Sequence, residues 1–156
     1  MHRFTGTDGF SPEGNLYLGT DGKLYGIAEY GGRFGGKSGC GTFFRLARSG
    51  NGFKVIYNFH GSADGCNPYA NVIADGSGTL YGTTRFGGSK NYGTLYKLTP
   101  KPTGGYTETL LYAFQGGNDG TDPVQSFLLR SGTLFGTTYR GGTDNQGTIF
   151  KTTTSQ

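Results

Sequence analysis

The chain has 156 residues, of which 32 are glycine, 5 are proline and none is tryptophan. Glycine at this frequency leaves no long window of good helix formers, which excludes a helical fold. No apolar run approaches the roughly 18 residues of a membrane span. Yet the chain has 12 Phe and 11 Tyr residues and a net charge of only +4, so it can bury a core. We therefore expect one folded all-β domain over residues 1–156.

The same order of short motifs occurs three times along the chain. A Phe-x-Gly motif begins at Phe4, Phe59 and Phe114, at intervals of 55 residues. Each copy continues with Asp-Gly-x-x-Pro, a Leu-aromatic-Gly motif, a double glycine, and Gly-Thr before an alternation of apolar and basic residues. Self-similarity at a fixed period is typical of repeat proteins. It divides the chain into repeats at about 4–58, 59–113 and 114–156, the last of them incomplete.

Within the second repeat the pattern predicts short strands separated by turn-forming residues. We expect these strands at residues 71–74, 79–84, 93–99 and 108–114. The Asp-Gly-x-x-Pro stretch is expected to be a connection, because its proline cannot donate to a strand ladder. Four antiparallel strands in each repeat predict a β-propeller with three four-stranded blades in the chain. A β-trefoil, which also contains three repeats of four strands, is the alternative.

These motifs resemble the bacterial GloVer (Gloeo/Verruco) β-propeller repeat. They are also similar to kelch blades, in which a double glycine ends the second strand. The resemblance is most specific in the second and third repeats, and in the second it is carried by Leu80-Tyr81-Gly82-Thr83-Thr84, Gly87-Gly88 and Gly93-Thr94-Leu95-Tyr96-Lys97-Leu98. The first repeat departs from the pattern, with Ile27-Ala28-Glu29 in place of the Thr-Thr pair. The resemblance implies a propeller in a bacterial surface or secreted protein, and it carries over no catalytic residue.

Three blades are too few to close a propeller, since closed rings typically have 4 to 8. Residues 1–4 (Met1, His2, Arg3 and Phe4) correspond to the end of a fourth strand, at 56–59, whereas the third repeat stops after its third strand. We therefore predict that residues 1–4 of one copy complete the third blade of another copy. The ring would be a homodimer of six blades or a homotrimer of nine. The alternative is that the chain is a piece of a longer repeat protein.

The two cysteines lie in loops that an up-and-down blade places on one face. Cys40 falls between the second and third strands of the first repeat, and Cys66 falls in the connection to the second. A disulfide is therefore plausible, with two free thiols as the alternative. A disulfide would indicate an oxidising compartment, so we expect an extracytoplasmic or secreted protein.

An aromatic and a basic residue accompany each double glycine on that same face. Aromatic rings stack on sugar faces, and arginine pairs with anions. A carbohydrate or acidic glycan is therefore the predicted ligand class, against the alternative that the rings cover the loop base and the arginines are solvated. The candidate residues are Tyr30, Arg33, Arg85, Phe86, Tyr139 and Arg140.

Other candidate sites have weaker support. Residues 31–38 match a phosphate-binding loop, but a strand is expected after them where that loop needs a helix. The basic residues form no cluster, so no nucleic acid partner is expected.

The acidic residues favour turns over chemistry. The aspartates before glycine, such as Asp64, support turns through their own side chains. Asp119 and Asp122 are weak candidates for calcium, and no metal or cofactor is predicted. We therefore expect a structural or ligand-binding module without catalytic activity. The alternative is a polysaccharide hydrolase or lyase that uses carboxylates on the loop face.

Overall fold

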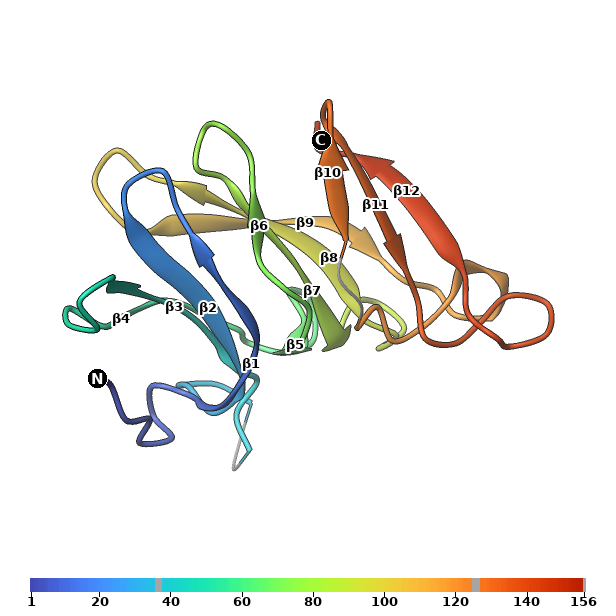
Figure 1. Cartoon of the computed structure of the whole chain (residues 1–156). Helices are drawn as coiled ribbons and strands as arrows, with labels where there is room; N and C mark the ends of the chain where they lie inside the picture. The colour runs from blue at the N-terminus through green and yellow to red at the C-terminus, as the bar shows by residue number, and fades with distance from the viewer. Residues whose placement is uncertain (36–37, 125–126, 156) are drawn as a thin grey trace.

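The structure is a computed structural model that describes residues 1–35, 38–124 and 127–155 (Figure 1). One short 3-10 turn, η1 (Gly117–Asp119), interrupts a chain otherwise built from strands and loops. No helix in the described part is long or apolar enough to span a membrane. The strands are β1 (Phe10–Leu18), β2 (Lys23–Tyr30), β3 (Thr42–Ala47), β4 (Lys54–Asn58), β5 (Cys66–Pro68), β6 (Ile73–Ala74), β7 (Leu80–Phe86), β8 (Thr94–Pro100), β9 (Tyr106–Ala113), β10 (Leu128–Arg130), β11 (Thr133–Thr137) and β12 (Ile149–Thr153).

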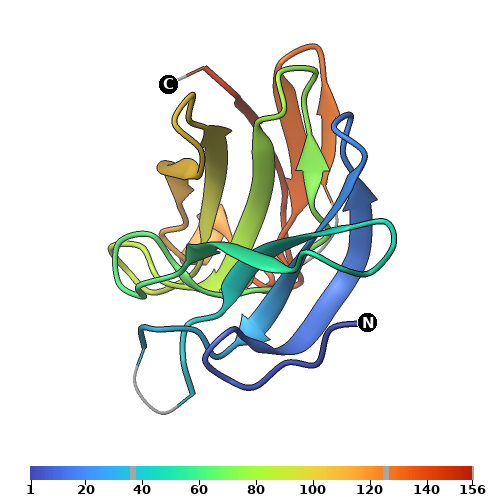
Figure 2. The ribbon, with the colours of Figure 1, turned by 90° about the vertical axis from the view of Figure 1, so that its left-hand side faces the viewer.

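Each repeat forms its own antiparallel sheet. The order is β1-β2-β3-β4 in the first sheet, β5-β7-β8-β9 in the second and β10-β11-β12 in the third, and β6 pairs with β7 beside β5. The sheets stand side by side and are twisted relative to one another (Figures 1 and 2). They are successive β-propeller blades, called blade 1, blade 2 and blade 3 below. The all-β propeller prediction is confirmed and the β-trefoil alternative is wrong.

The predicted role of the Asp-Gly-x-x-Pro stretch is partly wrong, because its proline lies inside a strand. Pro12 belongs to β1 and Pro68 to β5, and these strands pair with β2 and β7 respectively. Both β1 and β5 lie at the end of their sheet order. An edge strand accepts proline because the missing N–H faces away from the ladder.

A glycine on the second strand of each blade faces an aromatic residue on the third. Gly26 pairs with Phe44 in blade 1, and a Cβ added to Gly26 would lie 2.6 Å from the end of the Phe44 ring. Gly82 faces the ring of Tyr96 in the same way in blade 2. The Leu-aromatic-Gly motif is therefore required by packing, because the glycine leaves room for a ring to lie across the sheet.

The hydrophobic core lies between the blades. One cluster joins blades 1 and 2 through Phe43, Leu80 and Tyr96, and a second joins blades 2 and 3 through Leu95 and Leu134. Burial of apolar surface between blades therefore holds the three sheets together.

The Phe-x-Gly phenylalanine packs on the blade that follows it. Phe59 lies 5.0 Å from Tyr96 between ring centroids, and Phe4 lies 5.3 Å from Phe44. Residues 1–4, expected as the end of a strand, form no strand in the structure. No neighbouring strand pairs with them in the described chain, and ring packing against blade 1 holds Phe4 instead.

The aspartate that follows each Phe-x-Gly motif closes the turn between blades. In the second repeat the carboxylate of Asp64 accepts hydrogen bonds from the backbone N–H of His60 and from the hydroxyl of Tyr57. In the third, Asp119 accepts them from the N–H of Gln115 and the hydroxyl of Tyr112. The side chains therefore act as turn supports, as the sequence predicts.

Candidate ligand-binding site

The loops after the second strands and the connections between blades meet on one face, here called the loop face. Cys40 and Cys66 come from these two kinds of loop and form a disulfide. The N–H of Asn67 also donates to the carbonyl of Cys40 at 2.9 Å. The structure therefore brings the two cysteines together and ties blade 1 to blade 2 at this face.

The blade 1 candidates do not line the hollow described below, although Tyr30 interacts electrostatically with Arg85 of blade 2. The Tyr30 ring stacks on Phe10 with 5.3 Å between centroids, and its hydrogen bond to Glu29 raises the pKa of the Tyr30 hydroxyl. Arg33 is exposed, and its backbone N–H donates to the side chain of Asn58. Neither Tyr30 nor Arg33 lines a hollow with the candidates from blades 2 and 3.

The blade 2 candidates pair with each other and with blade 3. The guanidinium of Arg85 lies 5.2 Å from the centre of the Phe86 ring. Its Nε lies 3.6 Å from a carboxylate oxygen of Asp122, on the connection to blade 3. The ring and the carboxylate therefore hold this guanidinium at the junction of the two blades.

Three of the six candidates meet in a hollow of about 450 Å³ between blades 2 and 3. They are Arg85, Tyr139 and Arg140, and Asp122 lines the same wall. The guanidinium of Arg140 lies 5.8 Å from the centre of the exposed Tyr139 ring. Arg140 forms no ion pair with any residue that the structure describes, so its charge is available to a ligand.

Two residues of this hollow were missed by the sequence reasoning. Tyr69 and Val124 each follow the proline of an Asp-Gly-x-x-Pro motif, and they line the hollow beside Arg85. The position after that proline is the signal that could have identified them, since both residues occupy it. Tyr69 adds an aromatic ring to the wall.

The weaker candidates have structural partners. Asp122 adopts a positive φ of 53° before Pro123 and pairs with Arg85. Within residues 1–35, 38–124 and 127–155, no three His, Cys, Asp or Glu side chains are arranged to hold a metal ion. In the phosphate-loop match the next strand is β3, and Gly36 and Lys37 lie outside the described residues.

A carboxyl group with an altered environment lies between blades 1 and 2. Burial, together with the nearby carboxylate of Asp64, raises the pKa of Glu108 to about 7. One of its oxygens is buried and has no hydrogen-bond partner among the described residues. Glu108 lines none of the hollows on the loop face described above, so it is not placed to act on a ligand there.

Comparison with known families fits this repeat geometry. A profile of the Gloeobacter/Verrucomicrobia repeat matches residues 33–156. The chain belongs to the Gloeobacter/Verrucomicrobia repeat family. The resemblance inferred from the motifs is thus confirmed, and the matched range begins in the loop after β2 of the divergent first repeat.

Comparisons with individual proteins add little to the family assignment. No curated protein matches this Gloeobacter/Verrucomicrobia repeat chain. Among solved structures, a protein assigned as a 6-phosphogluconolactonase from Bacteroides fragilis is similar, with 16% identity and a TM-score of 0.48. The alignment covers 83% of this chain and 35% of that one, so the present chain spans about a third of its length.

Proposed function

We propose that this chain is a non-catalytic propeller module that binds an acidic carbohydrate in the hollow between blades 2 and 3. The observation that carries the proposal is the meeting of Arg85 and Arg140 with the exposed ring of Tyr139 around a hollow of about 450 Å³. A ring offers an apolar surface to a sugar face, and a guanidinium pairs with a carboxylate in two parallel hydrogen bonds. A uronic acid unit has both an apolar sugar face and a carboxylate.

The charge balance of the hollow supports an anionic ligand. Two guanidinium groups and the single carboxylate of Asp122 line it, and Asp122 already lies beside Arg85. Arg140 lines the hollow beside the Tyr139 ring and forms no ion pair with any residue in the described part of the chain. Loops held on a rigid sheet scaffold are common places for binding sites.

Calorimetric titration with an oligogalacturonate tests the proposal, with the methyl-esterified oligosaccharide as the uncharged comparison. We expect binding of the charged form only, and a loss of about tenfold or more in affinity for Arg140→Ala, as befits a charge-assisted hydrogen bond. Tyr139→Ala should weaken binding as well. Arg33→Ala, which removes an exposed arginine from the blade 1 loop, is the matched control and should leave affinity unchanged.

The same titration can refute the proposal. Equal binding of the charged and esterified forms would remove the role of the arginines. If Arg33→Ala and Arg140→Ala weaken oligogalacturonate binding equally, the binding comes from general attraction between charges and not from a defined site. Absence of binding to a panel of uronic oligosaccharides would reject the carbohydrate ligand.

A polysaccharide hydrolase or lyase is the second candidate, and Asp122 is the observation that favours it. This carboxylate lines the hollow beside two arginines, where a sugar carboxylate would be neutralised. Incubation with the same oligogalacturonate, followed by analysis of chain length, separates the two functions. Binding without cleavage supports the module, whereas cleavage that is lost in Asp122→Asn supports the enzyme.

We also propose that copies of the chain close into a propeller ring and that the protein acts outside the cytoplasm. Three blades leave two blade faces without a neighbour in the described chain, and closed propellers typically have 4 to 8 blades. Two copies would supply six blades and three copies nine. The Cys40–Cys66 disulfide supports an oxidising compartment.

A further inference from the structure

The outer face of blade 3 exposes apolar side chains whose equivalents in the other blades are buried. Ile149 is 86% exposed, whereas Phe43 and Leu95, at the same repeat position, are 0% exposed. Phe135 is likewise exposed, while its equivalent Tyr81 is buried against blade 3. We call this surface the leading face of blade 3, and its residues are Leu128, Phe135 and Ile149.

The opposite end of the molecule shows the complementary exposure. Leu16 on β1 is 51% exposed, whereas its equivalents Val72 and Phe127 are 5% and 7% exposed, each packed against a preceding blade. We call this surface the trailing face of blade 1; its residues are Leu16, Leu18 and Leu46, with the buried Phe44 beside them.

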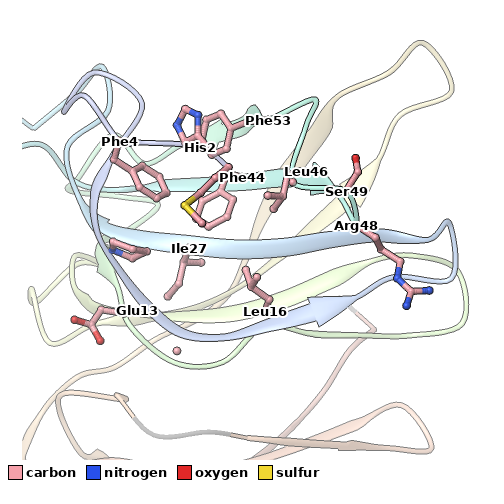
Figure 3. A pocket seen from close by; sticks show the side chains of 14 residues that line it. His2, Phe4, Glu13, Leu16, Ile27, Phe44, Leu46, Arg48, Ser49 and Phe53 are labelled. Carbon is pink, nitrogen blue, oxygen red and sulfur yellow. The ribbon is translucent and has the colours of Figure 1, made fainter.

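A cavity of about 710 Å³ opens on the trailing face of blade 1. Leu16 lines it from β1, Ile27 from β2, and Phe44 and Leu46 from β3, and Phe4 and Phe53 form one end (Figure 3). In the internal junctions the same space beside the third-strand aromatic residue is filled by the apolar face of the preceding blade. The cavity therefore lies where a preceding blade would pack.

The backbone of blade 1 at Ser11 has the conformation found where blades 2 and 3 contact the blade before them. At the internal junctions, the N–H of Asn67 donates to the carbonyl of Cys40, and that of Asp122 to the carbonyl of Tyr92. Asn67 and Asp122 have positive φ angles of 61° and 53°. Ser11, the equivalent residue of blade 1, has a φ of 51°, although the described chain has no blade before it. Ser11 therefore shares the left-handed backbone of the two residues that make the internal junctions.

The leading face of blade 3 carries the matching polar groups. Gln146 occupies the position of Cys40 and Tyr92, so its carbonyl is the expected acceptor for the N–H of Ser11. At the internal junction, the Lys97 ammonium donates to the carbonyl of Thr154 in the next blade at 3.1 Å. Lys151 is the blade 3 equivalent of Lys97, and its expected acceptor is the backbone carbonyl of Arg48 on the cavity rim, the blade 1 equivalent of Thr154.

We propose that the leading face of blade 3 docks on the trailing face of blade 1 of a second copy of this chain. The inference rests on the ring closure proposed above and assigns it to named surfaces. The residues on both sides of the proposed contact occupy the same repeat positions as those of the two internal junctions. A partner of unrelated sequence would not explain this correspondence. The contact is head to tail, so two copies form two identical junctions and close six blades.

Light scattering on a size-exclusion column, using the whole chain, tests the docking. The wild type should have a mass that is a multiple of 16.6 kDa, with two copies expected. Ile149→Asp and Leu16→Asp each destroy one of the two docking surfaces and should each give monomers. An equal mixture of the two variants retains one intact junction and should give a complex of two chains. Phe34→Asp, at an exposed aromatic position outside both faces, is the control and should leave the mass unchanged.

The outcomes separate this inference from the ring proposal. A wild-type chain that stays monomeric would overturn both. If the oligomer persists in Ile149→Asp and Leu16→Asp, the assigned docking surfaces are wrong, and the ring would have to close through another contact. A mixture that stays monomeric would overturn the head-to-tail arrangement.

Ile149 and Leu16 are both exposed, so the variants should fold, and circular dichroism checks this. Phe135→Asp with Leu18→Asp is a second pair for the same mixing experiment.

Discussion

The hydroxyl of Tyr57 lies 2.6 Å from a carboxylate oxygen of Asp64, to which it donates a hydrogen bond. Tyr57 is on the last strand of blade 1, and Asp64 is in the turn that leads to blade 2. The same carboxylate accepts two contacts from His60, one from its backbone N–H and one at 2.9 Å from ring Nδ1. One buried carboxylate thus organises the whole connection between two sheets.

We expect Tyr57→Phe to lower the free energy of unfolding by about 1.5–3 kcal/mol, because it removes one hydrogen-bond donor from a buried carboxylate whose other donors come from His60. Urea denaturation measures this change. Tyr112→Phe removes the equivalent donor to Asp119 at a more exposed position and is the matched comparison. A larger loss for Tyr112→Phe than for Tyr57→Phe would contradict the argument from burial.

Gly26→Ala should destabilise the protein by about 1–3 kcal/mol, because its Cβ would overlap the Phe44 ring packed across the sheet. Gly76→Ala is the control. Gly76 does not have a positive φ, and nothing lies within 4 Å of its Cβ position. Thermal unfolding should give a clear fall in Tm for the first variant and no fall for the second. Equal Tm values would show that the aromatic ring moves aside freely.

Stability should fall as the pH rises from about 4.5 to about 7, because over this range the folded protein holds Glu108 protonated. The ordinary pKa of this carboxyl is 4.5, and burial beside Asp64 raises it to about 7 in the folded state. Between these values the unfolded chain loses a proton that the folded chain keeps, so raising the pH favours unfolding. The groups that face Glu108 are Asp64, His60, Tyr57 and Tyr96.

Glu108→Gln tests this pH dependence. The variant should be more stable than the wild type above pH 7, and its Tm should vary less between pH 5 and 8. Asp144→Asn removes one negative charge at an exposed position and should keep the wild-type profile. A Glu108→Gln profile parallel to that of the wild type would assign the pH dependence to other groups.

Loss of the Cys40–Cys66 disulfide should lower stability by about 3–4 kcal/mol, the chain-entropy value for a loop of this size. The double variant Cys40→Ala, Cys66→Ala should melt at a lower temperature than the oxidised wild type. Reductant should lower the Tm of the wild type and leave that of the double variant unchanged. Mass spectra that show no gain of two hydrogens on reduction would contradict the bond.

The sequence predicts the blade architecture because certain strand and turn positions in each repeat require a particular residue. Gly26 and Gly82 recur because a ring lies over them, and Asp64 recurs because it closes a connection. The strand that contains Pro68 could not be predicted in the same way. Whether proline is tolerated depends on where the strand lies in the sheet, and one repeat does not contain that information.

The candidate site was only partly predictable for a related reason. Arg85 and Arg140 lie at adjacent repeat positions just before a double glycine, and the structure brings them to one hollow. Tyr30 occupies an equivalent repeat position but stacks on Phe10, a neighbour that depends on the path of the preceding strand. Tyr69 joins the hollow from a connection between blades. Repeat position alone does not determine which loops become neighbours.

The packing of Phe59 on Tyr96 makes residues 59–113 a self-contained cassette. The anchoring ring, the turn aspartate and the whole of blade 2 lie within this one segment. One continuous stretch of sequence therefore contains one complete blade. Such a segment can be duplicated in tandem with the same backbone join, and Cys66 of the second copy would then meet Tyr92 in place of Cys40 and stay a free thiol. We expect that insertion of a second copy of 59–113 after Ala113 would lengthen the array by one blade while preserving every existing contact within the blades.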